Sequence, residues 1–205
     1  IRHLNEFTRL DFELTYADTQ SAKETLVEAI NHIIEAVTHQ CASELELLGI
    51  TLKEQKSIPE ITYDDAMVLL AKDKTQLSLD PTDEKKLCEY SQSKFNSDYI
   101  FVTNLPSENR PFYEKENCGF VLLSNGLEIA SGGEHISDYT EQVQKLKKSG
   151  YDCADYESFL SAHKFALPQI CGAGIGLERF LMALLNLDNI RSAALFTRDL
   201  HYLTP

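Results

Sequence analysis

A glycine-spaced run in the last third of the chain combines residue types that a nucleotide site needs. Gly172-Ala-Gly-Ile-Gly-Leu-Glu-Arg179 leads directly into the apolar segment Phe180–Leu187. Glycines let the backbone approach a ligand closely because they carry no Cβ. Arg179 offers a flat, permanently charged fork that can stack on a base or bind phosphate. The pattern suggests a nucleotide site, and the alternative is a glycine-rich turn before a core helix with Arg179 as a surface charge.

The composition favours one globular domain, residues 1–205. A chain of 205 residues with 43% hydrophobic content can bury a sizeable core. No apolar stretch has the length of a membrane span, and no basic-then-apolar leader points to secretion. Five scattered cysteines without a Cys-x-x-Cys pair argue against a disulfide frame or zinc site and fit a reducing cytoplasm. The net charge of −13 argues against binding nucleic acid through overall charge, so an RNA contact would need a local basic patch or a separate domain.

The hydrophobic patterns predict an α+β fold, an antiparallel sheet with helices packed around it. Alternation predicts a strand over 10–16 with one buried face, and Asp18 or Thr19 begins a helix that Gly49 ends. Asn125-Gly126 predicts a hairpin, because both turn positions need positive φ. The other predicted elements are a helix over 63–70 after Thr62, a helix from Pro81 to about Lys94, a strand over 99–103, hairpin strands over 119–124 and 127–131, a helix from Ser137 or Asp138 to Gly150, a helix over 154–165, and an extended piece over 190–196.

Four separated segments form one pattern when they are taken together in sequence order. They are Arg2-His-Leu-Asn-Glu-Phe-Thr-Arg-Leu-Asp-Phe-Glu13, Arg110-Pro-Phe-Tyr113, Gly126-Leu-Glu-Ile-Ala-Ser-Gly-Gly133, and Gly174-Ile-Gly-Leu-Glu-Arg179 with Asn189-Ile-Arg191 and Phe196-Thr-Arg198 behind it. Their order and spacing resemble the catalytic domain of the class II aspartyl- and asparaginyl-tRNA synthetases, most closely the archaeal-type aspartyl branch. The first segment resembles the second half of motif 2 and the last resembles motif 3. The resemblance runs along the whole chain.

The resemblance implies a class II catalytic fold and an ATP-dependent ligase. In that family an amino acid carboxylate attacks the α-phosphate of ATP, and the acyl group then passes from the adenylate to tRNA. The chemistry depends on positioning and charge neutralisation. By resemblance, Arg179 and Glu128 are the catalytic residues. The same resemblance assigns Arg2, His3, Leu4, Phe7, Gly176, Leu177, Glu178 and Arg179 to ATP, Glu128 and Ser131 to Mg²⁺, and Ser131, Gly133, His135 and Arg110 to the amino acid pocket.

Several of these residues have simpler interpretations. Glu128 could be the polar position of a half-buried strand, Phe7 could be ordinary core, and Arg110 could be a surface charge. In the functional interpretation Phe7 is a platform for the adenine ring. Oxygen donors such as Glu128 suit a magnesium ion that keeps waters and bridges phosphates.

The departures from the family pattern gather at the amino acid pocket. His135 stands where the family usually has an arginine that holds the substrate side chain, and Ser137 stands where it has a histidine. Val121 replaces an acidic residue, and Gln169-Ile170-Cys171 replaces Pro-His-Gly. Histidine is mostly neutral at pH 7 and cannot replace a bidentate, always-charged clamp. Either the pocket accepts a different acyl substrate, or catalysis has been lost while the fold was kept.

By resemblance, motif 1, the first half of motif 2 and an anticodon-binding barrel should precede residue 1. We therefore expect a fragment that is not competent alone, with an open sheet edge at the strand that starts at Leu10, and a homodimer at full length. The expected partners are an amino acid and tRNA. Two other functions stay open: a tRNA-independent amino acid-activating paralogue, such as an archaeal-type asparagine synthetase, and a non-catalytic paralogue.

Overall fold

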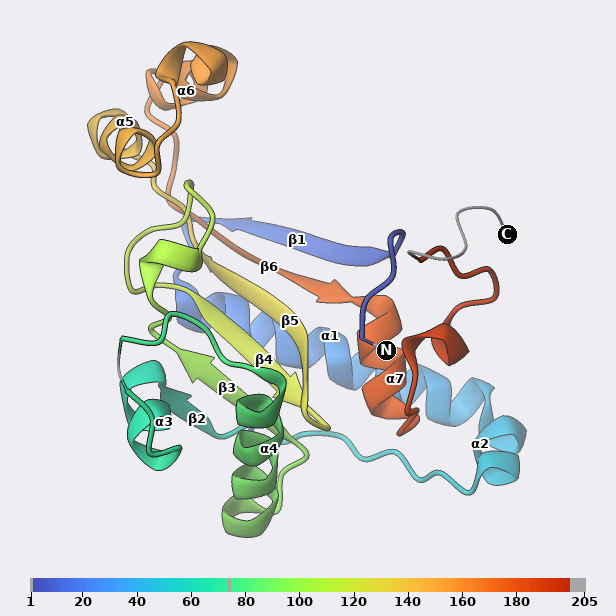
Figure 1. Ribbon diagram of the computed structural model, residues 1–205. Coiled ribbons are helices and arrows are strands. Elements are labelled where there is room, and N and C mark those ends of the chain that lie inside the picture. Colours follow the sequence, from blue (N-terminus) through green and yellow to red (C-terminus); the bar gives the residue numbers. More distant parts are fainter. Residues whose placement is uncertain (1, 74, 200–205) are drawn as a thin grey trace.

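A six-stranded sheet forms the centre of the protein (Figure 1). The computed structural model describes residues 2–73 and 75–199. The strand order is β1-β6-β5-β4-β3-β2, and every neighbouring pair is antiparallel except β2 and β3. The predicted α+β class is confirmed, with one parallel pair that makes the sheet mixed. The strands are β1 (Arg9–Thr15), β2 (Glu60–Thr62), β3 (Tyr99–Thr103), β4 (Phe120–Ser124), β5 (Leu127–Glu134) and β6 (Ile170–Gly176).

Helices cover the two faces of the sheet unequally (Figure 1). α1 (Thr19–Gln40) crosses one face against β5 and β6, and α7 (Leu177–Leu184) packs beside it. α3 (Tyr63–Leu69) and α4 (Pro81–Phe95) cover the β2–β4 half of the other face, and α4 also contacts β5. The remaining helices are α2 (Ala42–Leu48), α5 (Tyr139–Lys148) and α6 (Glu157–His163), with 3₁₀ turns at Ser107–Asn109, Cys153–Tyr156 and Ile190–Ala193. Neither α3 nor α4 packs over β1 and β6, so this part of the second face has no helix over it among the described residues.

Successive strand residues feed two separate cores, because their side chains alternate between the faces. Phe101 and Leu122 join the core under α1, whereas Ile100 and Leu123 join the core under α3 and α4. The predicted apolar stripe of α1 lies against the first core, with Leu26, Ile30 and Ile34 buried and Val27, Ile33 and Val37 half-buried.

Local sequence signals set most element boundaries. The Asp18, Thr62 and Asp138 side chains accept hydrogen bonds from the first turns of α1, α3 and α5, as predicted. Asn125 and Gly126 both have positive φ, which confirms the predicted hairpin turn. No helix within the described residues is both long enough and apolar enough to cross a membrane.

Three expectations need correction. The extended piece predicted over 190–196 is instead the 3₁₀ turn Ile190–Ala193, which the Asn189 side chain caps. The helix expected to run to Gly49 breaks at Cys41 into α1 and α2. The strand predicted over 10–16 ends at Thr15, because Tyr16 has positive φ and is exposed.

The predicted buried face of the first strand is also weaker than alternation suggests. Leu10 is exposed, while Phe12 and Leu14 are half-buried. β1 lies at the edge of the sheet, as expected, so it packs against fewer neighbours than an interior strand does.

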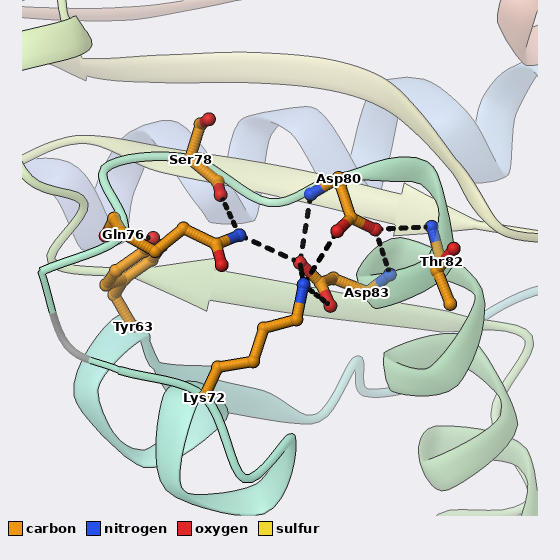
Figure 2. A network of polar contacts seen from close by, with 7 residues as sticks. All are labelled: Tyr63, Lys72, Gln76, Ser78, Asp80, Thr82 and Asp83. Carbon is orange, nitrogen blue, oxygen red and sulfur yellow. Dashed lines mark hydrogen bonds and ion pairs between the residues drawn. The ribbon is translucent and has the colours of Figure 1, made fainter.

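A network of polar contacts fastens the segment between α3 and α4 (Figure 2). Asp83 is fully buried, and its carboxylate accepts hydrogen bonds from Lys72 at 2.7 Å and from Gln76 at 3.0 Å. Asp80 caps α4 and also binds Lys72, whose hydrogen bond lowers the pKa of Asp80 to about 2. The network fixes the first turn of α4, and the next residue, Glu84, reaches the candidate site described below.

Candidate active site

The glycine run is a strand, β6, and not a turn. Cys171, Ala173 and Ile175 point into the α1 core, so Gly172, Gly174 and Gly176 fall on the opposite face, which α3 and α4 cover only in part. We call the uncovered part of this face the open face. A Cβ at Gly174 would collide with the side chains of Asp11 and Arg9, its neighbours on β1. The glycines therefore make a floor across which side chains from neighbouring strands, or a ligand, can lie.

A β-bulge brings the two predicted metal residues to the same face. Glu128 and Ser131 are three residues apart and would point to opposite faces of a regular strand. The register shifts, however: Leu122 faces Ala130 whereas Leu123 faces Glu128, so Ile129 is an extra residue. As a result both Glu128 and Ser131 line one cavity on the open face.

This cavity has a volume of about 260 Å³ and collects charged side chains from three segments. Arg2, His3 and Arg9 come from the N-terminal segment, and Glu178 and Arg179 come from the first turn of α7. Nine of the predicted site residues line it: Arg2, His3, Leu4, Phe7, Glu128, Ser131, Gly176, Glu178 and Arg179. Sequence reasoning did not assign the other lining residues, Arg9, Ile129, Ala130, Gly174 and Ile190.

Arg179 is held in place by neutral groups. Its Nε donates to the backbone oxygen of Arg2 at 3.3 Å and its Nη1 donates to the backbone oxygen of Glu128 at 3.2 Å. Within the described part of the chain it forms no ion pair. The carbonyls orient the guanidinium without neutralising it, so its charge is available to a ligand.

The side chains of Arg2, His3 and Glu128 have more constrained surroundings in the cavity. Arg2 pairs with Glu84 of α4 and has a buried Nε without a hydrogen-bond partner. Burial, Arg179 and Arg2 lower the pKa of His3, which makes it a neutral hydrogen-bonding group at pH 7. Burial raises the pKa of Glu128, against the opposing effect of Arg179, Arg110 and Arg2.

Two side chains near the cavity differ in what they contact. Phe7 is 57% exposed and lines the cavity, so it is not the core residue that the simpler interpretation required. Leu177 was predicted to line the ATP site, and this is a correction: its side chain packs against the α1 core and is not part of the cavity wall. Its N–H donates to Thr8 O at 2.9 Å, while the Glu178 carboxylate accepts from Thr8 N at 3.0 Å. These bonds tie the N-terminal segment to α7.

The predicted amino acid residues Arg110, Gly133 and His135 do not line this cavity. Arg110 is not a surface charge: its side chain is 17% exposed and makes an ion pair with Glu114. His135 Nε2 lies 3.6 Å from a carboxylate oxygen of Glu13, and its ring packs against Tyr113. Arg110 and His135 are thus both engaged by the protein's own side chains.

The substituted positions have ordinary structural surroundings. Val121 is buried in the α3–α4 core and faces Ser131 across the strands. Ile170 begins β6, where its carbonyl accepts from His135 N at 2.8 Å. Both positions thus support the strands that carry the site.

The donor set fits a nucleotide and a hard cation better than a metal bound by protein alone. No group of three His, Cys, Asp or Glu side chains that could hold a metal exists among the described residues. Glu128 and Ser131 nevertheless supply two oxygen donors on one face. Mg²⁺ is usually bound by one or two protein oxygens together with waters and phosphates.

Comparison with known proteins agrees with the fold. Residues 1–200 match the family described as tRNA synthetases class II (D, K and N). The chain therefore belongs to the class II tRNA synthetase family (D, K and N).

Curated relatives and solved structures place it near two specificities. The chain is 36% identical to the aspartate–tRNA(Asp/Asn) ligase of Thermus thermophilus, covering all of this chain and 51% of that protein. It is 33% identical to the aspartate–tRNA(Asp) ligase of Thermoplasma acidophilum, over all of this chain and 49% of that protein.

The structural matches have 26% sequence identity. The aspartyl-tRNA synthetase of Entamoeba histolytica superposes with a TM-score of 0.92 over all of this chain and 46% of that one. The asparaginyl-tRNA synthetase of Pyrococcus horikoshii, complexed with asparaginyl-adenylate, superposes with a TM-score of 0.89 over all of this chain and 50% of that one. The chain thus spans about half the length of the relatives it matches.

Proposed function

We propose that the protein acts in ATP-dependent amino acid activation and transfer of the amino acid to tRNA. The observation that carries the proposal is the cavity that Arg179, held only by carbonyls, lines together with the half-buried Glu128. The names of three curated relatives, from Thermus thermophilus, Thermoplasma acidophilum and Methanothermobacter thermautotrophicus, are aspartate–tRNA ligases and support the same reaction.

In this proposal the cavity binds ATP through complementary charge and stacking. Arg179 and Arg2 neutralise phosphate oxygens, and His3 donates a hydrogen bond. Phe7, exposed at the cavity, stacks on the adenine ring. Gly176 begins α7 and lets the nucleotide approach the backbone, and Leu4 forms an apolar wall.

The residues Glu128 and Ser131 would hold Mg²⁺, which neutralises phosphate charge when it is bound. Glu128 is the catalytic carboxylate of the proposal because it lines the same cavity as Arg179 and Ser131, where it could bind a cation that bridges phosphates. Its elevated pKa in the free protein reflects burial, and a bound cation would favour the ionised form. The bulge at Ile129 is what places both donors on the reactive side of the sheet.

The amino acid carboxylate that attacks the α-phosphate would lie beside Ser131, along the direction of Gly133. The proposed partners are the amino acid, tRNA, and a second copy of the full-length protein in a homodimer, in the cytoplasm. The relatives' names favour tRNA as the acceptor over a tRNA-independent synthetase. A non-catalytic role is the competing hypothesis, because positions such as Val121, His135 and Ile170 depart from the family pattern.

The test is ATP–pyrophosphate exchange by the full-length protein with each standard amino acid, accompanied by calorimetric titration with Mg²⁺–ATP. Saturable ATP binding together with exchange for at least one amino acid is the expected result. Arg179→Met should bind Mg²⁺–ATP more weakly. Lys147→Met, on the exposed side of α5, also removes one positive charge and is the matched control, so it should behave as the wild type. Binding without exchange for any amino acid would favour the non-catalytic paralogue.

A further inference from the structure

The Arg110 and Glu114 side chains form a complete carboxylate-recognition unit inside the protein. Arg110 Nε donates to Glu114 Oε1 at 2.8 Å and Arg110 Nη2 donates to Glu114 Oε2 at 2.6 Å. This two-pronged geometry is the one by which arginine recognises carboxylate ligands. The Glu114 side chain is 5% exposed, so water competes little for the pair. Burial opposes the charge on Arg110, but Glu114 outweighs it and raises the pKa of the guanidinium.

The backbone around the pair is shaped to hold a carboxylate group. A Cβ on Gly133 would lie 2.8 Å from the carboxyl carbon of Glu114, and a Cβ on Gly119 would collide with its Oε1. Both positions must therefore be glycine for the carboxylate to fit. Arg110 Nη2 also donates to the Gly132 carbonyl at 3.3 Å, which orients the fork toward this space.

The position of Glu114 relative to the candidate site follows from strand register. Glu114 pairs with His135 in an antiparallel bridge, and Lys115 N donates to Glu134 O at 2.8 Å. Directly opposed residues of an antiparallel pair share a face, and so do residues two apart along one strand. Glu114 therefore lies on the same face as Ser131 and Gly133, just past the end of the cavity that Ser131 lines.

We propose that Glu114 is a specificity-determining residue: its carboxylate occupies Arg110 as an internal ligand and keeps acidic amino acid side chains out of the site. The proposal rests on the proposed function, in which the amino acid extends from Ser131 toward Gly133. With Glu114 in place, Arg110 is already paired and is not available to an acidic side chain, and the Glu114 carboxylate carries the same charge as that side chain. The substrate class is thus an amino acid with an uncharged side chain.

Removing the internal carboxylate should convert Arg110 into a receptor for external ones. In the Glu114→Ala variant, aspartate should bind at least about tenfold more tightly than in the wild type, because a charge-assisted pair replaces a repulsion. Asparagine affinity should change much less. Calorimetric titration of each amino acid with Mg²⁺–ATP present measures both effects.

Two further variants separate the proposal from a general loosening of the site. The gain for aspartate should vanish in the Arg110→Met/Glu114→Ala double variant, since the receptor is then absent. Glu116→Ala removes an exposed carboxylate from the same segment and should leave aspartate binding at the wild-type level. A gain that persists without Arg110, or no gain in Glu114→Ala, overturns the proposal. So does weaker binding of every amino acid by Glu114→Ala, which would make Glu114 a substrate-contacting group.

A stability measurement keeps the test decisive if Glu114→Ala folds poorly. Sodium acetate should raise the melting temperature of Glu114→Ala well above any effect on the wild type, whereas sodium chloride at the same concentration should not. Equal responses to the two salts would overturn the internal-ligand interpretation. This readout needs no ATP, so the acetate result tests the internal-ligand interpretation independently. Failure of Mg²⁺–ATP to bind the wild type would contradict the proposed function alone.

Discussion

Arg179 and Arg110 lie toward opposite ends of the same open sheet face, and their surroundings differ in kind. Arg179 is oriented by two backbone carbonyls and lines a cavity. Arg110 is neutralised by a buried carboxylate and lines no part of that cavity. The comparison teaches that an arginine in a motif indicates a binding site only when its charge has been left without an internal partner.

Glycines flank both arginines and have opposite consequences. Gly176 leaves open space at the cavity, whereas Gly119 and Gly133 leave space that Glu114 fills. A glycine therefore provides room for another group, and the neighbouring side chains decide whether that group is a ligand or part of the protein.

The largest expected effect concerns Arg110. Arg110→Met should destabilise the fold by about 3–5 kcal/mol, because it leaves the Glu114 carboxylate buried and unpaired. Urea denaturation measures the change. Arg110→Met/Glu114→Gln should recover part of the loss, since the buried charge is gone. A cost below about 1 kcal/mol for Arg110→Met would mean that the pair is not buried as described.

The opposite pattern is expected for Arg179. Arg179→Met should lower the affinity for Mg²⁺–ATP by about 1.5–3 kcal/mol, the range for hydrogen bonds to charged groups. Stability should change by less than about 1 kcal/mol, because the lost partners are two carbonyls within reach of the solvent in the cavity. Calorimetry with Lys147→Met as the control tests this. Unchanged ATP affinity would remove Arg179 from the proposed site.

Stacking on Phe7 should contribute a similar or smaller amount. Phe7→Ala should weaken ATP binding by about 1–3 kcal/mol, the range measured for base–aromatic stacking. Phe7→Trp should retain most of the affinity. Because Phe7 is 57% exposed, neither variant should change the urea midpoint appreciably. Equal ATP affinities for Phe7→Ala and the wild type would place the adenine elsewhere.

Glu128 gives the smallest predicted effect and a pH dependence. Burial raises its pKa in the folded state, so ionisation of Glu128 costs stability as the pH rises from the ordinary carboxyl range through the raised value. Glu128→Gln should therefore raise the melting temperature at pH 7 by on the order of 2 °C. The difference should disappear near pH 4, where Glu128 is protonated in both states. A variant less stable than the wild type at pH 7 would contradict this electrostatic account.

The sequence predicted the elements with strong local signals. Helix caps such as Asp18 and the Asn125-Gly126 turn act through neighbouring backbone, so their effects are readable without tertiary information. The extended piece over 190–196 was wrong because the side chain of Asn189 caps a 3₁₀ turn that apolar content does not reveal.

The sequence named residues that line the candidate cavity, but it did not reveal how they come together. Glu128 and Ser131 could be named by resemblance, but only the bulge at Ile129 explains how both reach one face. Arg110 is held by Glu114, four residues along the chain, and by the Gly132 carbonyl, and the resemblance indicated neither contact.

The most direct test of the contrast between the two arginines is a crystal structure of the protein with magnesium and a non-hydrolysable ATP analogue. The account predicts phosphates in contact with Arg179, the metal beside Glu128 and Ser131, and the Arg110–Glu114 pair still closed. A nucleotide bound away from Arg179, or one whose phosphates open the pair and contact Arg110, would contradict it.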